Sequence, residues 1–307
     1  MSYLYYCPNL FCSMACKWCI QEHPNEFVRA IKDKSNHKLV IEWLKKNRFL
    51  DTLAIAGGEA TLHPGFKEII EELSSLYKIT VTTNLFSGLY KDMPGFIEWA
   101  KKFSVRWNTS YHPAQNLSVD VFIERVKAMK AADLNIDQVA SVDSHELSND
   151  YIRKLLTANI GWTLQYNTGV GVNTGQGIRP DPNGELKPRT QGDIRTYLPL
   201  AWNDWQKYVG ANYSKYHEAC GKVSLQTVQC ATDRIIIGPD DHIYTCHSLT
   251  YMQRKDLSLG HISTLMDLKE RGYKFWTPIK CDQFGRCDPC DVGCMKIKKD
   301  NCDWESY

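Results

Sequence analysis

Three cysteines near the start of the chain are the residues most able to do chemistry. Cys12, Cys16 and Cys19 have C-x3-C-x2-C spacing, and an aromatic residue, Trp18, stands just before the last of them. Three thiolates so close together can bind three irons of a four-iron cluster, and a fourth cysteine at matching spacing is missing. Such clusters are normally held by four cysteines, so one iron is left open. An open position favours a catalytic centre over a structural one.

A second motif follows further along the chain. Gly57, Gly58 and Glu59 come directly after an apolar run, residues 52–55, which has the pattern of a buried strand. Two successive glycines let a backbone approach a ligand closely, and Glu59 offers an acceptor for an ammonium group. A structural zinc site or buried cysteines also produce CxxC pairs, but the combination with this turn argues against both.

The combination resembles the radical S-adenosylmethionine (radical SAM) enzyme superfamily. In that family three cysteines hold a 4Fe-4S cluster, SAM binds the open iron through its amino and carboxylate groups, and a Gly-Gly-Glu turn binds the amino group. The resemblance therefore implies that the cluster is held by Cys12, Cys16 and Cys19. It implies that the SAM pocket is formed by Gly57, Gly58, Glu59, Asn84, Ser110 and Trp18, with Trp18 behind the adenine. For Asn84 and Ser110 a turn or capping role is the alternative, and for Trp18 simple packing.

The elements that must position these residues alternate along the first half of the chain. The pattern predicts strands at residues 4–7, 51–56, 79–83, 103–110, 134–142 and 160–166. It predicts helices at residues 38–48, 64–76, 96–102, 119–129 and 147–158. Strands that alternate with helices form a parallel sheet with crossover helices. The fold class is therefore α/β, and about six such units fit the partial (β/α)6 barrel that is usual in the radical SAM family.

Working residues of parallel barrels lie at the carboxyl ends of the strands. The cysteine triplet follows the first predicted strand and the Gly-Gly-Glu turn follows the second. Later strand ends carry Asn84, Ser110 and His112, Asp143 or His145, and Gln165 and Asn167. Candidates for substrate contact are His112, Asp143, His145, Arg179 and Glu185, with ordinary surface polarity as the alternative for each. No catalytic base can be named.

The remaining chain divides into two predicted parts after a barrel core at residues 1–167. Residues 168–219 form a bridging loop rich in glycine and proline, followed by a helix with one apolar and aromatic stripe. The stripe packs on the barrel or on the next domain, or else the glycine-rich loop and this helix cover the open barrel mouth and contact substrate. Residues 220–307 form a small cysteine-rich domain. Within it residues 234–244, between Cys230 and Cys246, consist of two β-prone runs around a turn, which predicts a hairpin.

The distribution of the 12 cysteines favours metal centres over disulfides. None lies between residues 20 and 219, and a reducing compartment disfavours structural disulfides. Hairpin and cysteines together resemble the SPASM/twitch extension of radical SAM enzymes, which carries one or two auxiliary 4Fe-4S clusters. Chain order then suggests a nearer cluster on Cys220, Cys230, Cys246 and Cys294. It leaves a farther one on Cys281, Cys287, Cys290 and Cys302. The spacing departs from the usual SPASM order, so a single twitch-like cluster or a zinc knuckle at Cys287 and Cys290 stays open.

Composition bounds the partners. Lys plus Arg (37) nearly balance Asp plus Glu (35), so nucleic-acid binding is unsupported and no membrane field is expected. The start of the chain does not read as a signal peptide, and no run is long enough to span a bilayer. We therefore expect a cytoplasmic protein.

The resemblance implies an oxidoreductase or modifying enzyme. One electron from the reduced cluster cleaves SAM, and the resulting 5′-deoxyadenosyl radical removes a substrate hydrogen. Auxiliary clusters would then take up an electron or bind the substrate. The extension favours a peptide or protein side chain as substrate, as in the modification of ribosomally made peptides. With the triplet beginning at residue 12, a separate peptide-recognition protein or a small leaderless substrate is expected.

Two other functions stay open. The first is a small-molecule dehydrogenase or epimerase acting on a sugar, cyclitol or nucleoside. An epimerase needs a thiol to return a hydrogen atom, and the candidates are Cys7 and an unliganded C-terminal cysteine. The second is an iron–sulfur electron-transfer protein, which does not account for the Gly-Gly-Glu turn. For the enzyme, an electron donor such as flavodoxin or ferredoxin is expected.

Overall fold

The computed structural model describes most of the two ends of the chain and little of its middle. The described residues are 2–14, 34–112, 118–143, 149–161, 163–166, 226–284, 295–298 and 305–306. The predicted bridging segment, residues 168–219, lies outside them. In the described part, no helix is long and apolar enough to cross a membrane.

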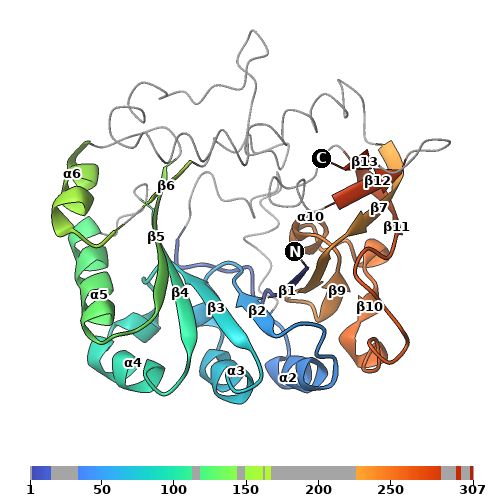
Figure 1. Cartoon of the computed structure of the whole chain (residues 1–307), viewed down its shortest axis with the longest axis horizontal. Helices are drawn as coiled ribbons and strands as arrows, with labels where there is room; N and C mark the ends of the chain where they lie inside the picture. Colours follow the sequence, from blue (N-terminus) through green and yellow to red (C-terminus); the bar gives the residue numbers. More distant parts are fainter. Residues whose placement is uncertain are drawn as a thin grey trace, which may run out of the picture.

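One large curved sheet organises the structure (Figure 1). Its nine strands have the order β10-β9-β8-β1-β2-β3-β4-β5-β6, and all neighbours from β8 to β6 are parallel. The first six strands in the chain are β1 (Tyr3–Tyr6), β2 (Thr52–Ile55), β3 (Lys78–Thr83), β4 (Val105–Tyr111), β5 (Ile136–Asp143) and β6 (Thr163–Tyr166). The predicted α/β class and parallel sheet are therefore confirmed.

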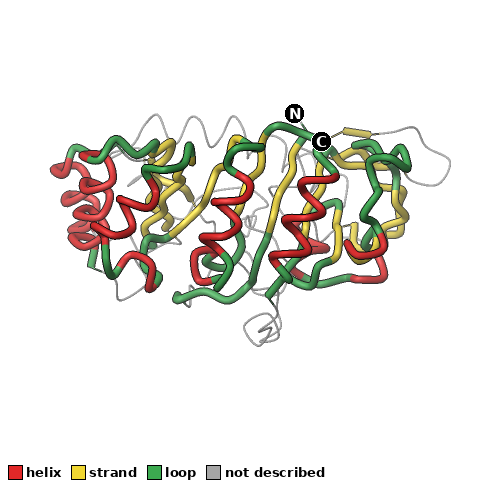
Figure 2. The backbone as a smooth tube through the Cα atoms, turned by 90° about the horizontal axis from the view of Figure 1, so that it is seen from below, coloured by secondary structure: helices red, strands yellow, loops and turns green. Residues whose placement is uncertain are grey.

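The crossover helices follow one another around the outside of this sheet (Figures 1 and 2). They are α2 (His37–Lys46), α3 (Phe66–Leu73), α4 (Met93–Ala100), α5 (Val119–Ala131) and α6 (Asn149–Ala158). Side chains of Asn36, Asp92 and Ser118 accept backbone N–H bonds at the starts of α2, α4 and α5, as good N-caps do. Helix α3 begins two residues after Pro64, because Gly65 occupies its N-cap position.

The core lies between the sheet and these helices. Its largest fully buried side chains include Trp43 on α2, Trp107 on β4 and Phe122 on α5. Each of these comes from an apolar face that the sequence pattern predicted as helix or strand. Tight packing on this side leaves the carboxyl ends of the strands to carry the polar residues.

The predicted hairpin is confirmed, and it continues the large sheet. Strands β8 (Arg234–Ile237) and β9 (His242–Tyr244) are antiparallel, and β8 pairs in parallel with β1 from Tyr3 to Tyr6. Strand β10 (Gly260–His261) adds the edge, and α10 (His247–Tyr251) follows β9. Apolar side chains of this region share the main core, among them Ile235, Ile237, Ile243, Ile262 and Leu268. The division at residue 220 into a distinct cluster-binding unit stays a prediction, and residues 234–268 are part of the barrel's sheet and core.

A second, antiparallel sheet holds the other described C-terminal strands. Its order is β11-β7-β12-β13, with β7 (Gln226–Thr232), β11 (Ile279–Phe284), β12 (Met295–Lys298) and β13 (Glu305–Ser306). Cys230 on β7 and Cys281 on β11 are both in this sheet. The sheet therefore carries two of the cysteines predicted to bind auxiliary clusters.

Candidate functional site

The predicted site residues lie where neighbouring parallel strands end. Tyr6 on β1 is aligned with Ile55 on β2, and Thr83 on β3 is aligned with Thr109 on β4. The segments that follow these residues therefore meet at one edge of the sheet. They are the stretch leading to Cys12, the Gly-Gly-Glu turn, Asn84 and Ser110.

The Gly-Gly-Glu turn packs directly on the segment that leads to Cys12. The backbone N–H of Gly58 donates to the carbonyl of Asn9 (3.0 Å), and that of Glu59 donates to the carbonyl of Phe11 (2.9 Å). A Cβ atom on Gly58 would lie 2.1 Å from the Phe11 oxygen, and one on Gly57 would lie 2.4 Å from the Asn9 oxygen. The close approach that requires glycine is therefore to the protein's own backbone. A further approach to a ligand at this turn stays a prediction.

Glu59 is buried, and its carboxylate is held by neutral donors. It accepts hydrogen bonds from the hydroxyls of Thr61 and Thr83, the latter at 2.8 Å, and from the backbone N–H of Asn84 at 2.8 Å. Burial raises the pKa of Glu59, and the bonds from Asn84, Thr61 and Thr83 act in the opposite direction. The side chain thereby joins the end of β2 to the end of β3. Its predicted role toward an ammonium group is not tested by this arrangement.

Asn84 connects this network to Cys12. Its side-chain Nδ2 lies 3.5 Å from Cys12 Sγ, and the backbone N–H of Met14 donates to the same sulfur at 3.4 Å. Its Oδ1 accepts the backbone N–H of Phe86 (2.8 Å), which fixes the amide orientation. Hydrogen bonds to a sulfur favour its charged form, and the thiolate is the form that binds metal. The described part of the triplet therefore fits an iron ligand.

The turn that presents Asn84 is held by residues that sequence reasoning missed. Leu85 is buried, and its backbone has φ +57°, a conformation that residues other than glycine rarely adopt. The Arg125 guanidinium, from α5, donates to the Leu85 carbonyl, and the Tyr90 hydroxyl donates to Thr83 Oγ1 at 2.9 Å. A basic residue on an otherwise amphipathic helix gives no local signal of such a role, so the sequence offered no means of finding it.

Ser110 and His112 form a pair at the end of β4. Ser110 Oγ lies 3.0 Å from His112 Nε2. Burial lowers the pKa of His112 to about 4, so its imidazole is neutral near pH 7. A neutral imidazole can accept or donate a hydrogen bond here without adding charge to the strand end.

The low pKa of His112 predicts a pH-dependent stability. The unfolded chain binds a proton near the ordinary value of 6.5 and the folded chain only near 4, so acidification between these values favours unfolding. We expect His112→Gln to reduce the loss of unfolding free energy between pH 7 and pH 5 by about 2 kcal/mol. Urea titrations of the iron-free protein at both pH values measure this difference. Equal losses in wild type and variant would show that folding does not lower the pKa of His112.

The remaining predicted residues are described in part. Of the C-terminal cysteines, Cys281 is buried in β11, and Cys246 caps α10, with its sulfur 3.5 Å from the backbone N of Leu249. Asp143 and Gln165 are described only as backbone in β5 and β6. Outside the described residues lie Cys16, Trp18, Cys19, His145, Asn167, Arg179, Glu185, Cys220, Cys287, Cys290, Cys294 and Cys302. Within the described ranges alone, no group of three or more potential metal ligands is formed.

Comparisons with known proteins agree with this geometry. The sequence model of the radical SAM superfamily matches residues 6–104, which contain the triplet, the Gly-Gly-Glu turn and Asn84. No curated protein sequence matches the chain.

Among solved structures, the chain is similar to Streptococcus suis SuiB in two crystal structures. One, bound to S-adenosylmethionine, has a TM-score of 0.53 at 14% identity over 87% of this chain, and the other has 0.54 at 15% over 87%. This chain spans 65% and 64% of the two SuiB chains. At this identity the likeness shows a shared fold. BtrN in complex with AdoMet and 2-DOIA matches over 89% of this chain and 82% of its own, at 9% identity and a TM-score of only 0.38.

Proposed function

From the match of residues 6–104 to the radical SAM superfamily model we infer that this chain is a radical SAM enzyme, and we propose that it cleaves SAM reductively to modify a peptide or protein side chain. The observation that carries the proposal is the convergence of Cys12, Asn84 and the Gly-Gly-Glu turn at one edge of the parallel sheet. An electron-transfer protein needs no such turn beside its cluster. The chain is accordingly an oxidoreductase or modifying enzyme.

Cys12, together with Cys16 and Cys19, would hold a 4Fe-4S cluster. When bound, that cluster supplies the electron that breaks a carbon–sulfur bond of SAM, which yields methionine and a 5′-deoxyadenosyl radical. The chain's own residues would bind the cluster and SAM and orient them toward each other. Asn84 and the Met14 N–H stabilise the Cys12 thiolate. The hydrogen bonds of Glu59 fix the ends of β2 and β3, which carry the Gly-Gly-Glu turn and Asn84. Gly57, Gly58, Glu59, Asn84, Ser110 and Trp18 would bind SAM.

One or two auxiliary clusters in the C-terminal extension form the second part of the proposal. Thr232, two residues after Cys230, donates its hydroxyl at 2.5 Å to the carbonyl of the residue before Cys246. Thr232 also pairs with Met295, the residue after Cys294. Cys230 and Cys246, two of the four cysteines assigned to the nearer cluster, thus belong to described segments that meet at Thr232, which supports that assignment.

The substrate class rests on the resemblance of the extension to those of peptide-modifying enzymes. The alternative of a small-molecule epimerase needs an accessible thiol. Of its two candidates, Cys7 is buried beside the Gly-Gly-Glu turn and donates to the Asn9 carbonyl at 3.4 Å. Burial disfavours Cys7 in that role and leaves an unliganded C-terminal cysteine as the candidate. The peptide substrate therefore rests on the resemblance of the extension, with a flavodoxin or ferredoxin as electron donor and a separate peptide-recognition protein as partner.

The experiment that tests the proposal is reductive SAM cleavage. The anaerobically reconstituted protein is incubated with SAM and dithionite, and 5′-deoxyadenosine is quantified, with unreduced protein as the control. We expect the nucleoside only in the reduced sample.

A further inference from the structure

The loop that carries the cysteine triplet, residues 12–33, is closed at its base. We call it the cluster loop. On one side of the base, Asn9 forms an isolated antiparallel bridge with Lys34. Beside it the backbone N–H of Ser35 donates to the Pro8 carbonyl at 3.0 Å. The cluster loop therefore leaves β1 and rejoins the fold at almost the same place.

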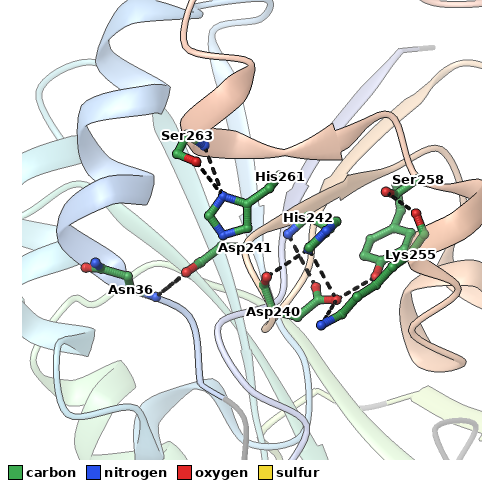
Figure 3. A network of polar contacts seen from close by, with 9 residues as sticks. Asn36, Asp240, Asp241, His242, Lys255, Ser258, His261 and Ser263 are labelled. Atoms are coloured by element: carbon green, nitrogen blue, oxygen red, sulfur yellow. Dashed lines mark hydrogen bonds and ion pairs between the residues drawn. The ribbon is translucent and has the colours of Figure 1, made fainter.

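The point of return is held by the C-terminal hairpin (Figure 3). Asn36, the N-cap of α2, donates its backbone N–H to both carboxylate oxygens of Asp241, each at 3.0 Å. Asp241 lies in the turn between β8 and β9, far away in the sequence. A charged acceptor at a helix start also interacts favourably with the helix dipole. The hairpin turn thus contacts the first residue after the base of the cluster loop.

Asp241 is itself fixed in the turn. Its φ is +59°, its backbone N–H donates to the Gly238 carbonyl at 3.2 Å, and its own carbonyl accepts the N–H of Ile262 at 2.8 Å. Burial and the neighbouring Asp240 raise the pKa of Asp241, whereas the Asn36 N–H, His261 and His242 favour the charged form. The carboxylate therefore stands in a defined position beside the Asn36 N–H.

The other end of α2 is held by the same C-terminal region. The Trp43 indole N–H donates to the Leu265 carbonyl at 2.8 Å. Asn47, at the C-cap, donates to the Met266 carbonyl (2.8 Å) and accepts the N–H of Lys269 (2.9 Å). Helix α2 is thus attached at both ends to residues 241–269. Because α2 begins where the cluster loop ends, this attachment fixes one end of the loop.

We propose that Asp241 is a positioning residue for the cluster loop, through which the C-terminal hairpin fixes the return of the loop into α2 and so the placement of its cysteines. The inference rests on the proposed function for the cluster itself. It assigns the C-terminal region a task at the SAM cluster, in addition to any auxiliary cluster it holds.

Two measurements on Asp241→Ala and Asp241→Asn test the inference. Hydrogen exchange of the iron-free protein reports the Asn36 amide. Iron release to a chelator from the reconstituted protein reports the triplet cluster, as the phase that is absent from the Cys12/Cys16/Cys19→Ala variant. We expect both to be about tenfold faster in Asp241→Ala, as loss of a hydrogen bond to a charged group allows. Asp241→Asn keeps one acceptor oxygen, and we expect it to lie between wild type and Asp241→Ala.

Asp267→Asn is the matched control, because Asp267 is a partly exposed carboxylate of the same region that pairs with Arg271 at 2.7 Å. We expect it to change neither rate. Faster exchange at Asn36 with unchanged iron release would overturn the positioning role, and unchanged exchange would overturn the contact. A wild-type chain that binds no iron at the triplet would overturn the proposed function and this inference with it. Exchange in the iron-free protein distinguishes that failure from a failure of the contact alone.

Discussion

Replacing Cys12, Cys16 and Cys19 together by alanine is expected to remove about four irons per chain and all 5′-deoxyadenosine formation. Without thiolates no iron is held at this strand edge, so the electron that cleaves SAM has no donor. Iron per chain, counted after anaerobic reconstitution, measures the first effect. A fall from about twelve to about eight indicates two auxiliary clusters, and a fall from about eight to about four indicates one.

Cys7→Ala is the control for this variant. Cys7 is a buried thiol outside the motif, and its pKa is raised by burial, which disfavours the thiolate that metal binding requires. We expect wild-type iron and wild-type SAM cleavage from it. Unchanged iron in the triple variant would show that these cysteines bind no cluster.

Gly58→Ala is expected to have the second largest effect. The new Cβ would lie 2.1 Å from the Phe11 carbonyl oxygen, and the obstruction is backbone that cannot rotate away. The turn and the segment leading to Cys12 must separate, with loss of the bonds from Gly58 and Glu59 to Asn9 and Phe11. We expect a loss of about 2–4 kcal/mol in unfolding free energy and a large loss of SAM cleavage.

The matched control is Gly88→Ala, since no atom lies within 4 Å of a Cβ built there. Urea unfolding of the iron-free proteins and the 5′-deoxyadenosine assay compare the two variants. We expect Gly88→Ala to retain wild-type stability and activity. If Gly58→Ala behaved like Gly88→Ala, the close packing of the turn on the cysteine segment would be wrong.

The order of strands and helices from β2 to β6 could be predicted from the sequence because each element has a local pattern. All five residues at 79–83 are β-branched. Apolar residues recur at helical spacing on α5, namely Val119, Phe122, Val126 and Met129. The structure places β3 and α5 at these residues with small shifts of their ends. Local propensity and burial agree here, so the pattern was sufficient.

The pairing of β8 with β1 could not be predicted. Both strands are short apolar runs, and nothing local distinguishes a hairpin in its own domain from one that joins the barrel sheet. The partner is chosen by long-range packing, in which Ile235 and Ile237 enter the main core. The contact between Asp241 and Asn36 follows from that pairing, so it could not be predicted from local sequence either.

The sequence predicted which residues form the candidate site better than it predicted their contacts. The motifs located Cys12, Glu59 and Asn84, and the structure brings all three together. For the glycines the structure shows a reason that the sequence did not suggest, the close approach to the backbone of Asn9 and Phe11, while the approach to a ligand stays a prediction. A close approach between two loops depends on their three-dimensional placement, which residue type alone does not encode.

The central claim is that this chain holds a SAM-cleaving cluster at the edge formed by Cys12, Glu59 and Asn84. The most direct test is the amount of 5′-deoxyadenosine formed by fully reconstituted wild-type protein with SAM and reductant. We predict 5′-deoxyadenosine and methionine in equal amounts, and neither without reductant. Iron-loaded protein that forms no 5′-deoxyadenosine would contradict the claim and favour an electron-transfer protein instead.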